Sequence, residues 1–242
     1  MGLLDIFKSS TPAEKAEKLK KKVTQKYGEA QARQKAIEEL VQTRSPDVVP
    51  VLMQRFTLVV DPQTTDADEK AMVFDAIATQ GEQAVPKVVE FLKKNEAASS
   101  WAVKILADIL EEPAVNTIVL DELRRLGTEY TRDPEKKSVL LHFLEGKQHD
   151  GIAEATITML KDMSDDVKMA ALRTLGTLKD VKAREPILEL LTTDETAKRV
   201  QTRCIEVLHE TGFEVQGFRE KVEKKLVEPF FVDKSGVVKK RG

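Results

Sequence analysis

A helical periodicity that repeats along most of the 242 residues is the feature that most constrains the fold. Apolar residues return every three or four positions in segments of about 10 to 16 residues, which Pro, Gly, Asp, Ser or Thr separates. The segments come in pairs, and the second members begin with similar turns centred on residues 50, 86, 116, 154 and 186, on average about 34 residues apart. This spacing is typical of an α-solenoid, in which neighbouring helix pairs bury one another's apolar faces. An irregular helical bundle is the alternative interpretation.

The predicted helix starts carry capping residues. Thr11-Pro12-Ala13-Glu14 offers an N-cap hydroxyl, a proline at the first helical position and a glutamate that returns a hydrogen bond. Further N-cap positions are expected at Ser45, Asp66 with Glu69, Asp133 and Ser164. We expect roughly thirteen helices, and an aromatic content of only 5% argues against a strand-rich fold.

The clearest first helix of a pair is Asp165–Gly176 (DDVKMAALRTLG), followed by Asp180 in the turn. This stretch resembles the HEAT-repeat family of armadillo type, in the short bacterial form known from phycobilisome lyase-like proteins. The resemblance extends weakly over about Glu29 to Leu226. It implies an all-α, right-handed α-solenoid of about six HEAT-like helical pairs, with first helices on the convex side and second helices on the concave side. It also implies small residues where repeats stack, and a first helix that ends at Gly176.

Three segments are expected along the chain. Residues 1–28 form an N-terminal amphipathic segment and basic helix, residues 29–226 the HEAT-like solenoid, and residues 227–242 a C-terminal hairpin or tail. Within the last segment, Phe230–Val232 and Val237-Val238 flank a turn-like Asp-Lys-Ser-Gly, which indicates a short β-hairpin. Because a lone hairpin is only marginally stable, it must pack against the last helix pair or a partner.

Charge is unevenly distributed along the chain. Residues 1–26 and 219–242 each carry a net +4, so the body between them carries −10. The first helix is lysine-rich, and Lys18, Lys20, Lys21 and Lys22 are the expected contacts to an anionic surface. Leu3, Leu4, Ile6 and Phe7 precede that helix. This N-terminal region caps the first repeat, docks on a partner or lies on a membrane; the sequence leaves the three open.

No motif for catalysis, a cofactor or a metal stands out. The three histidines, His142, His149 and His209, show no metal-ligand spacing, and no phosphate-binding glycine loop is present. The single cysteine, Cys204, lies on a predicted core stripe, where burial leaves the thiol inert. We therefore expect no catalytic, cofactor-binding or metal-binding residue. A nucleic-acid enzyme of the HEAT-like DNA glycosylase type is a remote alternative, because an acidic body with one tryptophan suits neither phosphates nor an extruded base.

The resemblance implies a non-enzymatic protein-binding scaffold or adaptor that uses its concave face. Helical phase places exposed contacts at Lys87, Glu90, Asp121, Arg124 and Glu189, while Trp101 is either inter-repeat core or an exposed anchor. A membrane-peripheral regulator, recruited by the basic N-terminal helix, is the alternative. One cysteine and no secretory signal favour a reducing cytoplasm, and the short repeat style favours a bacterial source. The oligomeric state and the partner's identity are not indicated.

Overall fold

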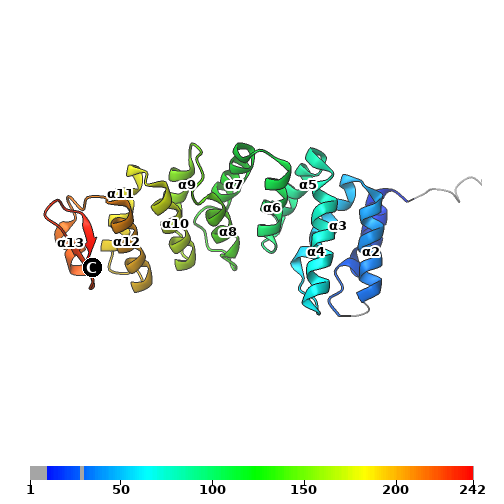
Figure 1. Cartoon of the computed structure of the whole chain (residues 1–242), viewed down its shortest axis with the longest axis horizontal. Helices are drawn as coiled ribbons and strands as arrows, with labels where there is room; N and C mark the ends of the chain where they lie inside the picture. Colours follow the sequence, from blue (N-terminus) through cyan, green and yellow to red (C-terminus); the bar gives the residue numbers. More distant parts are fainter. Residues whose placement is uncertain (1–9, 28–29, 242) are drawn as a thin grey trace, which may run out of the picture. The chain divides into compact units, whose positions relative to one another are not determined.

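The computed structural model describes residues 10–27 and 30–241. Within them the chain forms thirteen α-helices, four short 3-10 helices and one two-stranded sheet (Figure 1). The all-α class predicted from the periodicity is therefore confirmed, as is the C-terminal hairpin. The chain divides into two compact units between Val115 and Asn116. In each unit, helix pairs stack in two layers, as in an α-solenoid.

The N-terminal unit contains six complete helices. These are α1 (Pro12–Val23), α2 (Ala30–Thr43), α3 (Val49–Gln54), α4 (Gln63–Ala78), α5 (Val85–Lys94) and α6 (Ser99–Ile109). The first helices of the pairs, α2, α4 and α6, pack on one another in one layer, and α1, α3 and α5 form the other. Ile37, Leu40, Leu52, Ile77 and Leu92 are fully buried between the layers, so the apolar stripes predicted from the sequence are the core.

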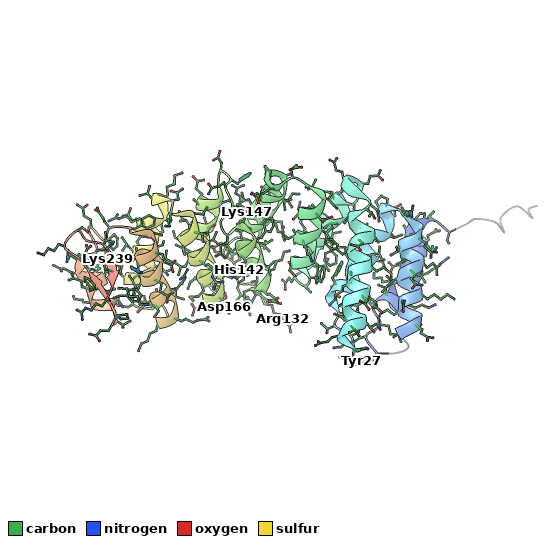
Figure 2. All side chains as sticks on the ribbon, in the orientation of Figure 1. Tyr27, Arg132, His142, Lys147, Asp166 and Lys239 are labelled. Carbon is green, nitrogen blue, oxygen red and sulfur yellow. The ribbon has the colours of Figure 1, made fainter. Side chains whose placement is uncertain are left out.

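The C-terminal unit repeats this arrangement. Its helices are α7 (Glu112–Leu126), which crosses the boundary, α8 (Glu135–Leu144), α9 (Ile152–Met159), α10 (Asp165–Leu178), α11 (Arg184–Thr192), α12 (Lys198–Thr211) and α13 (Arg219–Lys225). The first helices α8, α10 and α12 pack side by side, α9 and α11 pack against α10 and α12, and α13 packs on α11. Exposed charged side chains lie on the outside of the helices, such as Asp166 on α10, and in the loops, such as Arg132 before α8 (Figure 2).

Helix α1 covers the start of the helical stack. Thr11 and Glu14 form the predicted capping box, in which the Thr11 hydroxyl accepts from the Glu14 N–H and the Glu14 carboxylate accepts from the Thr11 N–H. Ala16 and Val23 are buried where α1 packs on α2 and α3. Helix α1 therefore takes the position that a second helix would occupy in a preceding pair. Residues 1–9, which include the apolar Leu3, Leu4, Ile6 and Phe7, lie outside the described residues.

The C-terminal hairpin covers the last helix pair. Strands β1 (Phe230–Val232) and β2 (Val238–Lys240) pair antiparallel, with Phe231 opposite Lys239. Strand β2 packs on α12 and β1 on α13, and Val238 is fully buried. The hairpin is thus stabilised by the last helix pair, one of the two predicted possibilities.

Gly176 differs from its predicted role. Helix α10 continues past it to Leu178 and ends at Lys179, which adopts a positive φ of 52°. A Cβ on Gly176 would lie 3.5 Å from the side chain of Val207 and 3.2 Å from the carboxylate of Glu210, both on α12. The prediction that Gly176 ends the helix is wrong, and its small size instead lets α12 approach α10 closely.

Asp66 and Glu69 do not cap a helix. Helix α4 begins three residues earlier, at Gln63, so Asp66 lies within its first turn and Glu69 within the core. The Asp66 carboxylate accepts from the Val60 N–H and from Arg55, and it pairs with Lys70 at 2.7 Å. These acidic residues tie the loop before α4 to the helix instead of starting it.

Candidate protein-binding surface

In each unit, the sequence predicts partner binding on the exposed side chains of the second helices, which are α5 in the N-terminal unit and α7, α9 and α11 in the C-terminal unit. We call these side chains, taken unit by unit, the second-helix surface. In the N-terminal unit Glu90 of α5 is exposed and Lys87 is half-buried. The Lys94 ammonium donates to Glu90 at 2.6 Å, and this hydrogen bond and charge lower the pKa of the Glu90 carboxyl. One of the two predicted contacts on α5 therefore already has an intramolecular partner.

In the C-terminal unit the predicted contacts lie on two helices. Asp121 and Arg124 are exposed on α7 and form a pair with each other at 3.4 Å. Glu189 is exposed on α11, and no ion pair is found for its carboxylate within the described residues. Glu189 is the predicted contact that also borders a pocket.

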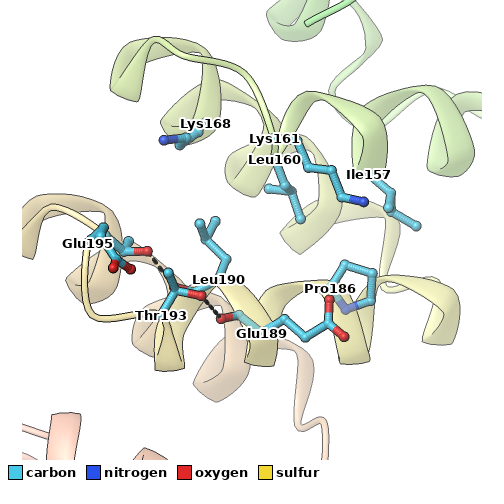
Figure 3. A pocket seen from close by; sticks show the side chains of 10 residues that line it. Ile157, Leu160, Lys161, Lys168, Pro186, Glu189, Leu190, Thr193 and Glu195 are labelled. Carbon is cyan, nitrogen blue, oxygen red and sulfur yellow. Dashed lines mark hydrogen bonds between the residues drawn. The ribbon is translucent and has the colours of Figure 1, made fainter.

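The pocket lies between α9 and α11 and has a volume of about 310 Å³. Its apolar lining comes from Ile157 and Leu160 on one side and from Pro186 and Leu190 on the other. Figure 3 shows Ile157 and Leu160 facing Pro186 and Leu190 across the opening. Ile157, Pro186 and Leu190 are only half-buried, so the pocket offers accessible apolar surface on an otherwise charged protein.

Charged side chains of opposite sign border the two sides of this pocket. Lys161 and Lys168 stand on the side of α9 and α10, whereas Glu189 and Glu195 stand on the side of α11 (Figure 3). Lys168 pairs with Asp165 at 3.6 Å. Within the described residues, Lys161, Glu189 and Glu195 have no ion pair, so their charges remain available to a bound molecule.

The two acidic residues Glu154 and Asp162, which lie on either side of Lys161 in the sequence, are already paired with other lysines. Asp162, its neighbour in sequence, is buried and accepts from the ammonium of Lys137 at 2.6 Å. Glu154 lies on α9, about two helical turns before Lys161, and it pairs with Lys182 at 3.4 Å. The local ion-pair network thus leaves the Lys161 ammonium without an acidic partner.

One wall of the pocket belongs to a recognisable sequence unit. Residues 167–193, which include most of α10 and all of α11, match the family model of the PBS lyase HEAT-like repeat. The chain carries a HEAT-like repeat. A search of curated proteins finds no match to this chain. The HEAT-like repeat supplies Lys168, Pro186, Glu189 and Leu190 to the pocket, and α9, the second helix of the preceding pair, supplies the opposite wall.

Trp101 lies on α6, a first helix, and not on the second-helix surface. Its ring stacks on Phe56 at a centroid distance of 4.6 Å and meets the edge of Phe74 at 6.4 Å. The ammonium of Lys104 lies 5.2 Å from the centroid of each of the Trp101 and Phe74 rings. Trp101 is half-buried by these contacts, which fits the inter-repeat packing alternative better than a free anchor.

The lysines of α1 lie at the start of the helical stack of the N-terminal unit. Lys18, Lys20, Lys21 and Lys22 are all exposed. Lys20 pairs with Glu17 at 3.2 Å, whereas the other three have no acidic partner among the described residues. They leave a small positive patch at the end of the N-terminal unit.

Two buried ion pairs between a lysine and a carboxylate were not predicted from the sequence. Lys136 lies 2.6 Å from Glu122, and Lys137 lies 2.6 Å from Asp162. All four side chains are at most 3% exposed. Burial raises the pKa of Glu122, but hydrogen bonds from Arg125 and Lys136 outweigh it and the net pKa is lowered. The first pair joins α7 to α8, and the second joins α8 to the loop after α9.

Among the described residues, the cysteine Cys204 and the histidine His209, two candidates for chemistry, are held in structural contacts. Cys204 is fully buried, and this burial raises the pKa of its thiol to about 12. His209 packs its ring against Phe230, with Nδ1 at 3.2 Å from the carbonyl of Val238. No group of three or more His, Cys, Asp or Glu side chains is placed to hold a metal ion in the part of the chain that the structure describes. None of the described helices is long and apolar enough to cross a bilayer.

Proposed function

We propose that this chain is a non-enzymatic scaffold or adaptor that binds another protein along its second-helix surface, in the cytoplasm. The observation that carries the proposal is the pocket between α9 and α11, where accessible apolar side chains lie beside the unpaired charges of Lys161, Glu189 and Glu195. Protein interfaces combine an apolar centre with a polar rim in this way.

The surface formed by the first helices α10 and α12 of the C-terminal unit differs from this pocket. Arg199 pairs with Asp165 and Asp166, and Arg203 pairs with Glu206 and Glu210. These charges neutralise one another within the chain and gain less from a partner. Asp121 with Arg124 and Glu154 with Lys182 form similar pairs that involve the second helices, so the contrast applies to the pocket between α9 and α11 and favours that pocket as the binding place.

Affinity capture from native lysate with the full chain tests the proposal. The test variant combines Asp121→Arg, Arg124→Asp and Glu189→Lys on the second helices. The matched control combines Asp68→Lys, Asp75→Lys and Arg173→Glu on exposed faces of the first helices, and it changes the net charge equally. We expect the test variant to lose specific proteins that the control retains. Recovery of identical proteins by both variants would contradict the proposal.

A second candidate function, recruitment to an anionic membrane surface, rests on the exposed Lys18, Lys21 and Lys22 of α1. Because Ala16 and Val23 are buried against α2 and α3, this helix has no free apolar face to insert. Contact through α1 would be electrostatic and would weaken strongly above about 0.5 M salt. Flotation with phosphatidylserine vesicles distinguishes the two, because Lys18→Gln, Lys21→Gln and Lys22→Gln together abolish only this interaction.

A further inference from the structure

The pocket between α9 and α11 specifies more than a general binding surface. Resting on the proposed scaffold function, we infer that it receives one large apolar side chain from a partner segment that carries an acidic residue on one side of that side chain and a basic residue on the other. The inference depends on the pocket's size, its lining and the placement of its charges.

The size limits the occupant to a small group, such as one large side chain or a small ligand. Pockets for drug-sized ligands have volumes of about 300 to 1,000 Å³, and this one, at about 310 Å³, lies at the lower limit. Ile157, Leu160, Pro186 and Leu190 supply an apolar lining without an aromatic ring. A leucine, methionine or phenylalanine that enters between them would exclude water from both walls, which is how interface anchors contribute affinity.

The charges set the chemistry of the neighbouring residues. Lys161 is exposed on the α9 side and has no ion pair in the described part of the chain, so it favours a carboxylate beside the anchor. Glu189 and Glu195 on the α11 side favour a lysine or arginine there. Since the two signs stand on opposite walls, a partner segment that crosses the pocket has one preferred direction.

The same charges disfavour other occupants. Glu189 and Glu195 repel a phosphate group, which argues against a nucleic acid or an anionic lipid at this place. A purely basic segment would be repelled by the unpaired Lys161, and a purely acidic one by the two glutamates. A segment of mixed charge around an apolar residue satisfies both walls.

Selection from a displayed library of random dodecapeptides on the immobilised full chain tests this inference. We expect the selected peptides to share a large apolar residue with an acidic and a basic residue on its two sides. Fluorescence anisotropy with a labelled consensus peptide then measures affinity for the wild-type chain and for Lys161→Glu, Glu189→Lys and their double variant. Both changed positions are exposed, and Arg173→Glu on α10 is the matched control.

We expect each single reversal to weaken the consensus peptide by about three- to five-fold, as rim charges do. A peptide with its two charges exchanged should regain affinity for the double variant. Replacement of the peptide's apolar residue by alanine should weaken binding at least about ten-fold. The Arg173→Glu chain should bind like the wild type.

Four outcomes would overturn the inference. Selected peptides of one charge sign, equal affinity for the wild-type and double-variant chains, or failure of the library to yield a binder would each do so. Self-association that competes with the peptide would identify a second copy of the chain as the occupant and overturn it as well. The scaffold function is tested separately by the affinity capture described above. It fails only if the triple variant on the second helices captures the same proteins as its control.

Discussion

The Nε atom of Arg55 lies 2.7 Å from the Oε2 atom of Glu69, and both side chains are buried in the N-terminal unit. The same carboxylate also accepts from Arg33 at 2.9 Å, so one glutamate on α4 holds guanidinium groups from α2 and from the end of α3. This buried junction joins two helix pairs.

Replacement of Glu69 should therefore destabilise the protein strongly. The Glu69→Gln change leaves Arg33 and Arg55 buried without a full counter-charge, and we expect a loss of about 3 to 5 kcal/mol in the free energy of unfolding. Urea denaturation followed by circular dichroism measures it. The control is Glu90→Gln, which breaks an exposed pair with Lys94 and should cost less than about 1 kcal/mol. Equal losses for the two variants would show that the buried junction does not stabilise the fold.

Acid should weaken the N-terminal unit through Asp66. Burial raises the pKa of this carboxyl, but hydrogen bonds from Lys70, Arg55 and the Val60 N–H outweigh it, so the net pKa falls below 3.8. A carboxyl whose pKa is lower in the folded than in the unfolded protein stabilises the folded state at pH values above its unfolded pKa. This stabilisation is lost as the pH falls through the pKa of the folded state. We expect the free energy of unfolding to fall below about pH 4.

The Asp66→Asn variant tests this dependence. It should be less stable than the wild type at pH 7, and its stability should change less between about pH 5 and pH 2.5 because the titrating group is gone. Urea denaturation over that pH range measures both. Parallel curves for the two proteins would mean that Asp66 does not contribute to the acid sensitivity.

Gly176 offers a test of close helix packing. Helical φ values at this position allow alanine, and the nearest obstacle is the flexible end of Glu210, so Gly176→Ala should change stability by less than about 1 kcal/mol. Gly176→Leu should cost about 1 to 3 kcal/mol, because its side chain meets Val207 on α12. Thermal unfolding compares the two variants. A Gly176→Leu variant that is as stable as the Gly176→Ala variant would contradict the packing role.

Cys204 should be unreactive in the folded protein. Its thiol is buried and its pKa is raised to about 12, so almost no thiolate exists at pH 8. We expect no reaction with a disulfide reagent such as dithionitrobenzoate in the native state and stoichiometric reaction after unfolding in guanidinium. Rapid labelling of native protein would show that α12 opens locally or that the thiol is exposed.

Local features were predictable from the sequence because their partners are close in the chain. The Thr11 and Glu14 capping box spans three residues, and the hairpin turn around Gly236 spans only a few more. The apolar stripes identified the core because burial follows helical phase. The fold class therefore followed from periodicity and short-range chemistry.

Contacts between distant residues were not predictable in this way. Lys137 and Asp162 are 25 residues apart. From the sequence alone, a lysine on a helix is expected to be exposed to solvent, because its buried acidic partner is not known. The register of the third pair was also misaligned. The sequence matches Asn116 to Pro50 and Pro86, but in the structure Pro113 is the second residue of α7 and Asn116 is fully buried.

The candidate site was predictable only in part. Helical phase identified Glu189 as exposed, but it gave no sign that Ile157 and Leu190 remain accessible, since apolar residues at such positions are normally core. The pocket depends on the spacing of α9 and α11 and on the course of the 193–196 loop. These are consequences of packing between pairs, which no short stretch of sequence encodes.

Site-specific photo-crosslinking in cells tests the central claim most directly. A photoreactive phenylalanine is placed at Glu90, Asp121 or Glu189 on the second helices, and at Lys35, Asp68 or Arg173 on the first helices, all exposed positions. The scaffold account predicts crosslinks to the same partner protein from second-helix positions and none from first-helix positions. Crosslinks chiefly from the first helices, or equal yields from both sets, would contradict it.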